Sequence, residues 1–437
     1  MIPSWDYLQN CLTISLMAWR FPLRPPIVIT PKPVVVAPPP PPPPPEPEEM
    51  VEVIEEPAAV VAPPVLILRW LFWRATLWLL IALGIQTLAS LMPQVIEFGY
   101  SQRAYLYIAQ ALAIFNRLFP FSVGEVFIGA LVVWFTGWTI WYLRRATRGE
   151  TRFFDVIKLL FLHLLWTFAT IHAFFLILWG LNFQRMPITD TWRLDRRPAR
   201  TDELQVIAQR IVTGINRNYA AASEGQDWAR TSRLPLTFQR LNQALDNTFQ
   251  TTALLGPASN GGWSPPKEMR LSRVASSLGI CGIFVPFTGE PTINTEIPAS
   301  EIPFAFANQK AHQRGYARES EANLVAYVIC INSAEPYIRY SGFLHAVKVL
   351  DDIERAGVGH YKDMIGVGPS ADLETRRQFW GTVKNPNVGT ISNEMINAYL
   401  RLNRVTRGMD NYDEDIPLII AYYLRGQSRQ SQVEELR

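Results

Sequence analysis

A chain of 437 residues has room for more than one domain, and 49% of its residues are hydrophobic while 18% are charged. This balance excludes a wholly soluble protein of this size. A net charge of +3 at pH 7 gives no basic footprint for nucleic acid, so DNA and RNA are not expected as partners. Three cysteines, Cys11, Cys281 and Cys330, form no disulfide framework, and the apolar surroundings of the last two indicate buried thiols.

The first 65 residues are predicted to be a disordered cytoplasmic segment rich in proline and glutamate. Prolines are continuous from Pro38 to Pro45, and glutamates follow up to Glu56. Proline has no backbone donor and favours an extended polyproline II form, while the acidic residues keep the segment solvated. We expect a semi-rigid tether, and the alternative is a docking site for a proline-binding domain.

Three apolar segments predict a membrane region over residues 66–188. Trp70–Leu91, Val123–Leu143 and Leu159–Leu181 each approach or exceed the roughly 20 residues that span a bilayer. Aromatic residues lie near their ends, as expected at the level of the lipid headgroups. The lipid bilayer is therefore the first expected partner. His163 and His172 fall in the third segment, nine residues apart and so on opposite helix faces, where a packed bundle interior and a proton relay are alternative roles.

Basic residues predict the orientation of these spans. The loop between the second and third spans holds a dense cluster, namely Arg144, Arg145, Arg148, Arg152 and Lys158. Such loops are cytoplasmic, which places the N-terminus inside and the region after the third span on the outer side, periplasmic or lumenal. The arginines between Arg185 and Arg200 oppose this orientation, but three spans separate the two ends of the region.

Between the first two spans, Gly99–Pro120 predicts a helix that lies in the membrane interface. Its apolar residues recur at helical spacing, at Tyr105, Ile108, Leu112, Phe115 and Leu118. Ser122 follows as a candidate N-cap for the second span.

Residues 189–425 predict a mainly helical α+β soluble domain, followed by a disordered tail over residues 426–437. The expected helices are Thr201–Tyr219, Leu236–Thr252, Asn308–Gly315, Glu319–Ile331, Tyr340–Arg355, Asn393–Leu402 and Ile416–Tyr423. Ile280–Phe287 predicts a strand, and the alternating Pro291–Ile297 predicts an exposed edge strand just before the helix at Asn308.

The segment Pro303–Cys330 has the spacing of a zinc-peptidase helix pair. In H-E-x-x-H sites, two histidines one turn apart hold the metal and the glutamate activates its water. Here these positions hold Asn308, Gln309 and His312, followed by the E-x-E-A-N segment Glu319–Asn323. An edge strand before such a helix is the arrangement in which zincin-like peptidases bind a substrate backbone.

The chain resembles an uncharacterised, domain-of-unknown-function family of multi-pass bacterial membrane proteins with a zincin-like metallopeptidase motif. The resemblance runs from about Gly99 to the C-terminus and rests on five ordered blocks: FPFSVGE from Phe119, WGLNFQR from Trp179, SSLGICGIFVPFTGEPTIN from Ser276, PFAFANQKAHQRGYARESEAN from Pro303 and RYSGFL from Arg339. It implies a zincin-like fold for the soluble domain, location in a bacterial cell membrane, and zinc-dependent proteolysis there.

In that family the motif helix typically reads H-E-M-A-H-Q. The resemblance implies that His312 and Glu321 are retained metal ligands, that Asn308 replaces a ligand histidine and that Gln309 replaces the general base. Asparagine suits zinc poorly, and glutamine accepts no proton from water. We therefore expect no cofactor, or zinc if the site is still competent.

Other polar residues are candidates for a cleft around the motif: Glu290, Asn294, Glu319, Asn323 and His345. His345 is also a candidate substitute ligand, and an ordinary hydrogen-bonded histidine is the alternative. Glu319, Glu321, His312 and Asn323 alternatively form a metal-free hydrogen-bond network between the two helices. Gly315 is expected to supply the turn between them, and Thr288–Glu290 a turn before the second strand, with Glu290 alternatively facing the cleft.

These observations leave three hypotheses for function. The first is a catalytically inactive, membrane-anchored peptidase-like protein that keeps a cleft for a peptide or a membrane-protein partner. The second is an active metallohydrolase with a rebuilt site around His312, Glu321 and His345. The third is a structural or scaffolding membrane protein.

Overall fold

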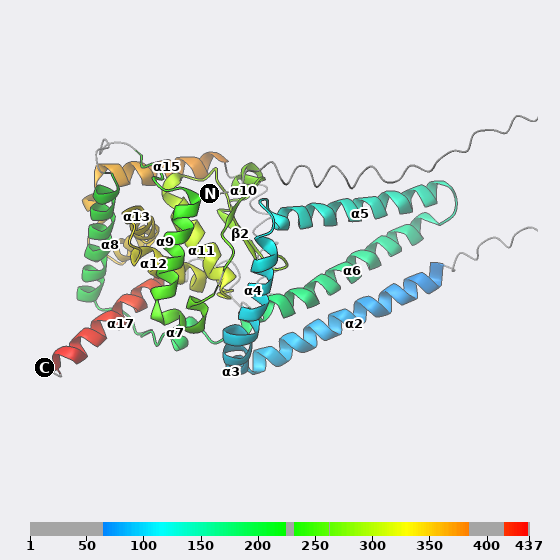
Figure 1. The fold of residues 1–437 in the computed structure, drawn as a ribbon, viewed down its shortest axis with the longest axis horizontal. Coiled ribbons are helices and arrows are strands. Elements are labelled where there is room, and N and C mark those ends of the chain that lie inside the picture. The colour runs from blue at the N-terminus through cyan, green and yellow to red at the C-terminus, as the bar shows by residue number, and fades with distance from the viewer. Residues whose placement is uncertain (1–63, 224–230, 262, 384–414, 436–437) are drawn as a thin grey trace, which may run out of the picture. The chain divides into compact units, whose positions relative to one another are not determined.

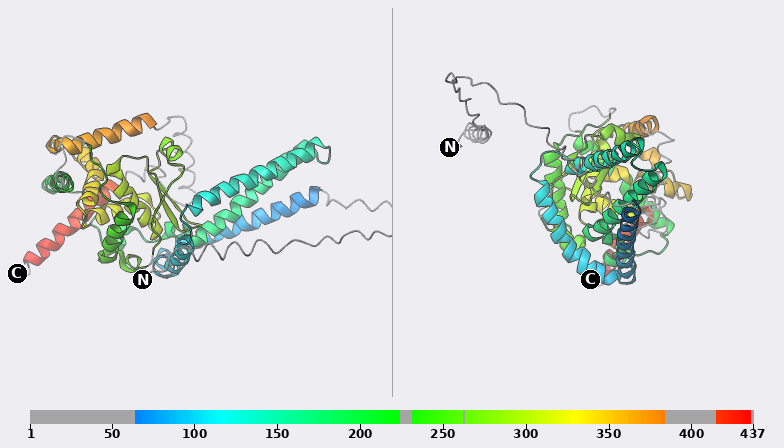
Figure 2. Two further views of the ribbon diagram at one scale, coloured as in Figure 1. Left: turned by 45° about the horizontal axis from the view of Figure 1, so that its top comes forward. Right: turned by 90° about the vertical axis from the view of Figure 1, so that its right-hand side faces the viewer.

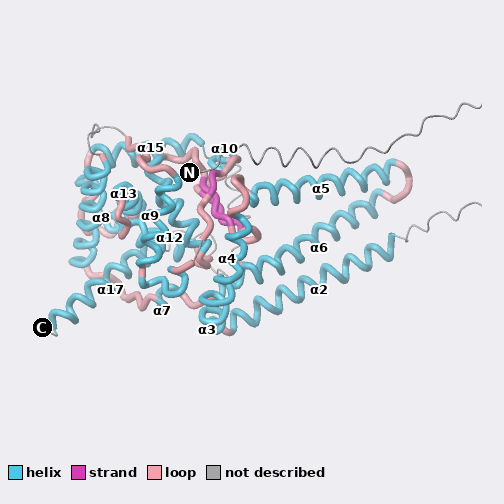
Figure 3. The backbone as a smooth tube through the Cα atoms, in the orientation of Figure 1, coloured by secondary structure: helices cyan, strands magenta, loops and turns pink. Residues whose placement is uncertain are grey.

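The computed structural model describes residues 64–223, 231–261, 263–383 and 415–435, and helices make up most of them (Figure 3). The proline-rich segment and the helix expected at Asn393–Leu402 lie outside the described residues.

Three long apolar helices match the predicted spans. They are α2 (Pro64–Leu91), α5 (Val123–Thr147) and α6 (Phe153–Leu178), and each is long and apolar enough to cross a bilayer. In Figure 1 they extend away from the remaining helices, with α2 packed along α6. Only 6% of the apolar window of α5 is buried, against 33% for α6, so α5 presents nearly its whole surface to the surroundings.

The helix predicted between the first two spans is present in a modified form. A three-residue helix α3 (Pro93–Val95) leads into a π-helix, η1 (Ile96–Ala104), and then into α4 (Tyr105–Asn116). One face of α4 packs inward through Tyr105, Leu106 and Ala109. Apolar side chains also cover its outer face, where Tyr107 and Ile114 are exposed.

The second span begins at the predicted cap. Ser122 Oγ accepts a hydrogen bond of 3.1 Å from the Glu125 backbone N–H. This bond satisfies one of the free donors in the first turn of α5.

A short link leads from the third span into the helical domain. It contains the 3₁₀ helix η2 (Gly180–Gln184) and α7 (Ile188–Thr191). The helices that follow are α8 (Thr201–Ala222), α9 (Phe238–Thr251), α10 (Ser272–Ser277), α11 (Ile302–Gln313), α12 (Glu319–Ile331), α13 (Pro336–His345), α14 (Val347–Arg355), α15 (Val367–Val383) and α17 (Asp415–Glu435), with 3₁₀ turns η3 (Ala253–Ser259), η4 (Ala299–Glu301) and η5 (Lys362–Met364). The last helix continues to Glu435, beyond the expected end near Tyr423.

A small sheet lies beside α11 (Figure 2) and consists of β1 (Lys267–Glu268), β2 (Gly282–Val285) and β3 (Glu290–Ile293) in the order β1-β3-β2. β3 pairs parallel with β1, Lys267 opposite Thr292, and antiparallel with β2, Val285 opposite Glu290. The prediction that Pro291–Ile297 forms an edge strand was wrong. β3 is the central strand, because the two-residue β1, which has no recognisable strand pattern, pairs with its other edge. All four residues of β3 are buried, and α11 and α4 pack against the strand.

The motif helices occupy the centre of the domain. Every residue of α11 is buried, and α12 is buried from Ser320 to Cys330. α11 packs against α12, α13, β2 and β3. Helices this deeply enclosed must satisfy their polar side chains internally.

Candidate functional site

A glycine turn joins α11 to α12 and sets the two motif helices side by side. Gly315 has φ of 85°, and its N–H donates to the His312 carbonyl at 3.0 Å. A side chain there would lie 2.9 Å from Asn182 Oδ1 and 3.0 Å from the Tyr105 ring. Both the left-handed conformation and the close packing therefore require glycine, which confirms the predicted turn.

A polar network fills the space between these helices. The Asn308 side-chain amide donates to Glu319 Oε1 at 3.0 Å and to Asn323 Oδ1 at 2.9 Å. Its own oxygen accepts from Gln309 Nε2 at 2.8 Å. A hydrogen-bond network therefore links the two helices through Asn308, Gln309, Glu319 and Asn323, and Glu321, which the sequence also placed in such a network, is bonded elsewhere.

Both ring nitrogens of His312 are engaged in this network. Nδ1 lies 2.8 Å from the Tyr316 carbonyl oxygen, and Nε2 lies 2.9 Å from Glu319 Oε2. Both neighbours are oxygen acceptors, so each ring nitrogen has a partner within hydrogen-bond distance. Burial is the largest single effect on the pKa of Glu319 and raises it, but the nearby His312 and the Asn308 hydrogen bond together outweigh burial, so the pKa lies below its ordinary value.

Glu319, and not Glu321, faces the motif helix. Glu319 and Asn323 are one helical turn apart and so share a face of α12, whereas Glu321 is two residues along and points elsewhere. Glu321 Oε1 accepts from the Ile188 backbone N–H at 3.0 Å and from Arg318 at 2.8 Å. The position that the resemblance gave to Glu321 beside His312 is therefore taken by Glu319.

Gln309 lies between the network and the sheet. A side chain on Gly282 of β2 would lie 2.8 Å from Gln309 Cγ, so the glycine allows the close approach of strand and helix. Gln309 Oε1 is buried without a hydrogen-bond partner among the described residues. Of the two strands that pack against the motif helix, β2 is an edge strand of the sheet and β3 is the central one.

Glu290 and Asn294 hold the sheet to other elements rather than facing the network. Glu290 is fully buried, and its Oε2 accepts from the Gly124 N–H at 2.9 Å, at the start of α5. A carboxylate suits the positive end of a helix. Asn294 Nδ2 donates to Ser276 Oγ and to the Ile280 carbonyl.

His345 lies about one helical turn from the network. Its ring stacks on Phe304, with centroids 3.6 Å apart, and Phe304 precedes Asn308 by four residues on α11. Nε2 lies 3.1 Å from Asp415, and Lys348 is close to the same carboxylate. Burial lowers the pKa of His345 to about 4. His345 therefore makes its hydrogen bond to Asp415, as expected for an ordinary hydrogen-bonded histidine.

The residues at the motif fit zinc poorly. His312 supplies one imidazole and Glu319 one carboxylate, while Asn308 presents its amide N–H groups to the carboxylate. Within the described ranges, no group of three or more His, Cys, Asp and Glu side chains is arranged to hold a metal ion. Structural and catalytic zinc sites need three or four such ligands.

The network is tied to the membrane region through the backbone of α11. Trp179, directly after α6, donates from its indole nitrogen to the His312 carbonyl at 3.0 Å. Tyr105 of α4 donates to the Gln313 carbonyl at 2.6 Å. Arg185 donates to the Gly315 carbonyl and pairs with Glu97 of η1 at 2.7 Å, and both side chains of this pair are buried.

The motif helix also carries a buried pair of cations that was not predicted from the sequence. Lys310 and Arg314, four residues apart, both pair with Asp246 of α9, at 2.9 and 3.1 Å. Burial lowers the pKa of Lys310 to about 8, against an opposing effect of Asp246. The helical spacing of the two cations was the available signal, but it did not identify the acid on a distant helix.

The histidines of the third span both lie in apolar surroundings. His163 is bonded through Nδ1 to the Leu159 carbonyl, and its ring centroid lies 4.4 Å from that of Trp138. His172 lies between Phe168 and Phe175. Cys281 and Cys330 are both free thiols, and Cys330 is buried as predicted whereas Cys281 is only partly buried.

A family model described as a protein of unknown function, DUF3810, matches residues 100–420. The chain belongs to this family. This membership confirms the part of the sequence resemblance that concerned an uncharacterised family, and it covers the last two candidate spans together with α11 and α12. No curated protein and no solved structure matches the chain.

Proposed function

We propose that this DUF3810 member is a membrane-anchored, catalytically inactive metallopeptidase-like protein whose motif region serves binding or regulation. One observation carries the proposal: the positions of the metal ligands and the base are joined in a hydrogen-bond network that uses both nitrogens of His312. Gln309 cannot take a proton from water, so the hydrolytic step lacks its base.

The edge strand β2 supports a binding role. β2 pairs on one side with β3 and packs against the motif helix at Gly282. An extended peptide, from a soluble or a membrane protein, can add to such a strand through main-chain hydrogen bonds. The bound segment would then run beside Gln309, where a substrate would lie in an active relative.

Zinc analysis of the purified full-length chain tests the proposal. We expect the wild-type protein to hold no stoichiometric zinc. The double variant Asn308→His with Gln309→Glu restores the missing histidine ligand and the general base, and we expect it to bind about one zinc per chain.

Two matched additions to that double variant test the geometry. Glu319→Gln should abolish the restored zinc binding, and Glu321→Gln should retain it. Stoichiometric zinc in the wild-type protein that is lost on His312→Ala would instead support the active, rebuilt hydrolase.

A further inference from the structure

A cavity of about 860 Å³ lies on the side of α12 that faces away from the polar network, lined by residues of α7, α8, α12, α14, α17 and the loop after α7. Ligand sites in proteins commonly have volumes of about 300–1,000 Å³. Of the motif residues, only Glu321 with its neighbours Arg318 and Ser320 lines the cavity. It is a separate site from the one described above.

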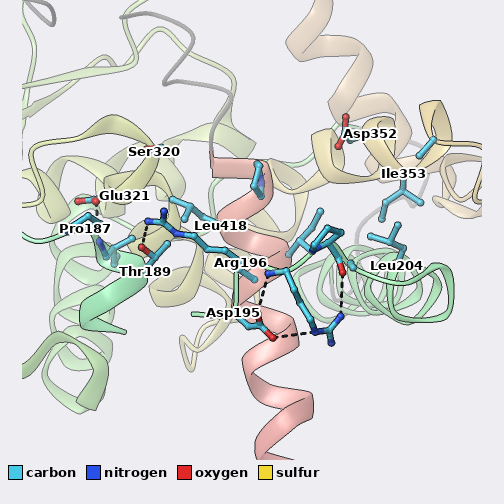
Figure 4. A pocket seen from close by; sticks show the side chains of 18 of the residues that line it. Pro187, Thr189, Asp195, Arg196, Leu204, Ser320, Glu321, Asp352, Ile353 and Leu418 are labelled. Carbon is cyan, nitrogen blue, oxygen red and sulfur yellow. Dashed lines mark hydrogen bonds and ion pairs between the residues drawn. The ribbon is translucent and has the colours of Figure 1, made fainter. Parts of the chain in front are cut away.

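The lining of the cavity is apolar and polar in similar measure. Its apolar lining includes Ile188, Leu204, Ile353, Leu418 and Ile420. Figure 4 shows Leu204 and Ile353 together at one end and Thr189 with Arg196 toward the other. The cavity can therefore hold an apolar body whose polar end lies by Arg196.

Among the described residues, each charged side chain of the lining has an ion-pair partner except Arg196, which is exposed; Asp352, for example, pairs with Arg355 outside the lining. Arg197 pairs with Glu203 and Asp195, and Arg318 pairs with Glu321. Arg196 forms no ion pair among the described residues, and its guanidinium donates to the Thr189 hydroxyl instead (Figure 4). One guanidinium is thus available to one negative charge.

We propose that this cavity binds a carboxylate that carries an apolar chain. A planar guanidinium accepts a carboxylate in a bidentate manner. A single unpaired cation balances one carboxylate but leaves the second charge of a phosphomonoester uncompensated. Two sources share this chemistry, a fatty acid from the bilayer and the free C-terminus of an apolar peptide.

The position of the cavity favours the fatty acid. Its wall begins at Pro187, nine residues after the end of the third span. Arg318, another lining residue, donates to the carbonyls of Phe183 and Arg185 in the same link. The cavity is therefore built onto the end of a membrane-spanning helix.

Calorimetry with the full-length chain in a neutral detergent tests the proposal near neutral pH. The probes are decanoate and its methyl ester, and an acetylated tetraleucine peptide with a free or an amidated C-terminus. We expect one carboxylate probe at least to bind about tenfold more tightly than its uncharged counterpart. Decanoate binding would identify the bilayer as the source, and peptide binding a protein C-terminus.

Three variants separate the parts of the site. Arg196→Gln should weaken binding of the carboxylate probe about tenfold and leave binding of the uncharged probe unchanged. Arg193→Gln, on the same loop but outside the lining, should change the binding of neither probe. Ala356→Trp, at the exposed rim of the cavity, should weaken binding of both the carboxylate and the uncharged probe. The proposal fails if no carboxylate binds, if ester or amide binds as well as the acid, or if Arg196→Gln has no effect. Unchanged thermal unfolding of the variants would show that a loss of binding is local.

Discussion

Glu319 accepts hydrogen bonds from two buried donors, Asn308 and His312, on the neighbouring helix. Removing the acceptor leaves both donors unsatisfied inside the domain, which costs about 2–5 kcal/mol. We expect Glu319→Ala to lower the thermal unfolding temperature clearly. The matched control is Glu268→Ala, because Glu268 is exposed on β1, and its unfolding temperature should stay close to that of the wild type. Equal temperatures for the two variants would contradict a structural role for the network.

Lys310 gives the domain a pH-dependent stability with a definite sign. Its pKa is about 8 in the folded chain, against an ordinary value of 10.5. Between these values the unfolded chain binds more protons than the folded one, so this residue makes stability rise as the pH increases from about 8 toward 10.5, and adds no pH dependence below 8. We expect Lys310→Met, which leaves Asp246 paired with Arg314, to remove this rise. Thermal unfolding of both proteins across that range measures it, and parallel curves would show that Lys310 does not titrate there.

At the scale of elements, the α11–α12 turn depends on one glycine. Gly315→Ala places a side chain in the left-handed region and within 3.0 Å of neighbouring atoms. Gly357 has a similar φ of 76° but open space around it, so Gly357→Ala measures the backbone cost alone, about 1 kcal/mol. We expect Gly315→Ala to destabilise the chain more than Gly357→Ala in thermal unfolding. Equal effects would mean that Asn182 and Tyr105 move away without cost.

Helix periodicity predicted the elements better than it predicted the partners of their side chains. The spans were predictable because apolar runs of this length have few other structures, and α11 and α12 because their apolar positions recur at helical spacing. The arrangement of the sheet was not predictable, since alternation in Pro291–Ile297 is the same for a central and an edge strand. Only β1, two residues with no pattern of their own, decides between them.

In the candidate site, the residues placed by local helical spacing were predictable, and those with distant partners were not. Asn308, Gln309 and His312 follow from the motif spacing, and Glu319 with Asn323 from the four-residue repeat on one helix face. The roles of Glu290, Asn294 and His345 depend on Gly124, Ser276 and Asp415, which lie 18 to 166 residues away. Local sequence carries no information about such distant partners.

At the scale of the whole molecule, a buried ion pair joins the membrane region to the domain. Glu97 of η1 pairs with Arg185, which also donates to the Gly315 carbonyl. Removing one partner leaves an uncompensated buried charge and costs about 3–5 kcal/mol. We expect Glu97→Gln and Arg185→Met each to lower the unfolding temperature strongly, and the double variant to recover part of the loss. If the double variant lost as much in unfolding temperature as the two single variants combined, the ion pair itself would contribute little to stability.

The predicted orientation, with the α5–α6 loop inside and the helical domain outside, has its own test. Arg148 in that loop and Met364 in the domain are both exposed. In a Cys11→Ala background, a membrane-impermeant thiol reagent should label Met364→Cys on intact right-side-out vesicles, and Arg148→Cys only after permeabilisation. The reverse pattern would place the domain in the cytoplasm.

Trp179 is both the first residue beyond the third span and a hydrogen-bond donor to the motif helix. A span that tilts to match a thinner or thicker bilayer carries this indole with it. The His312 carbonyl at the C-terminal end of α11 accepts a hydrogen bond from this indole, while the Phe304 N–H near the N-terminal end donates to Ser341 of α13. A tilt of the third span would therefore act first on the end of α11 that carries His312, which is one helical turn from Asn308.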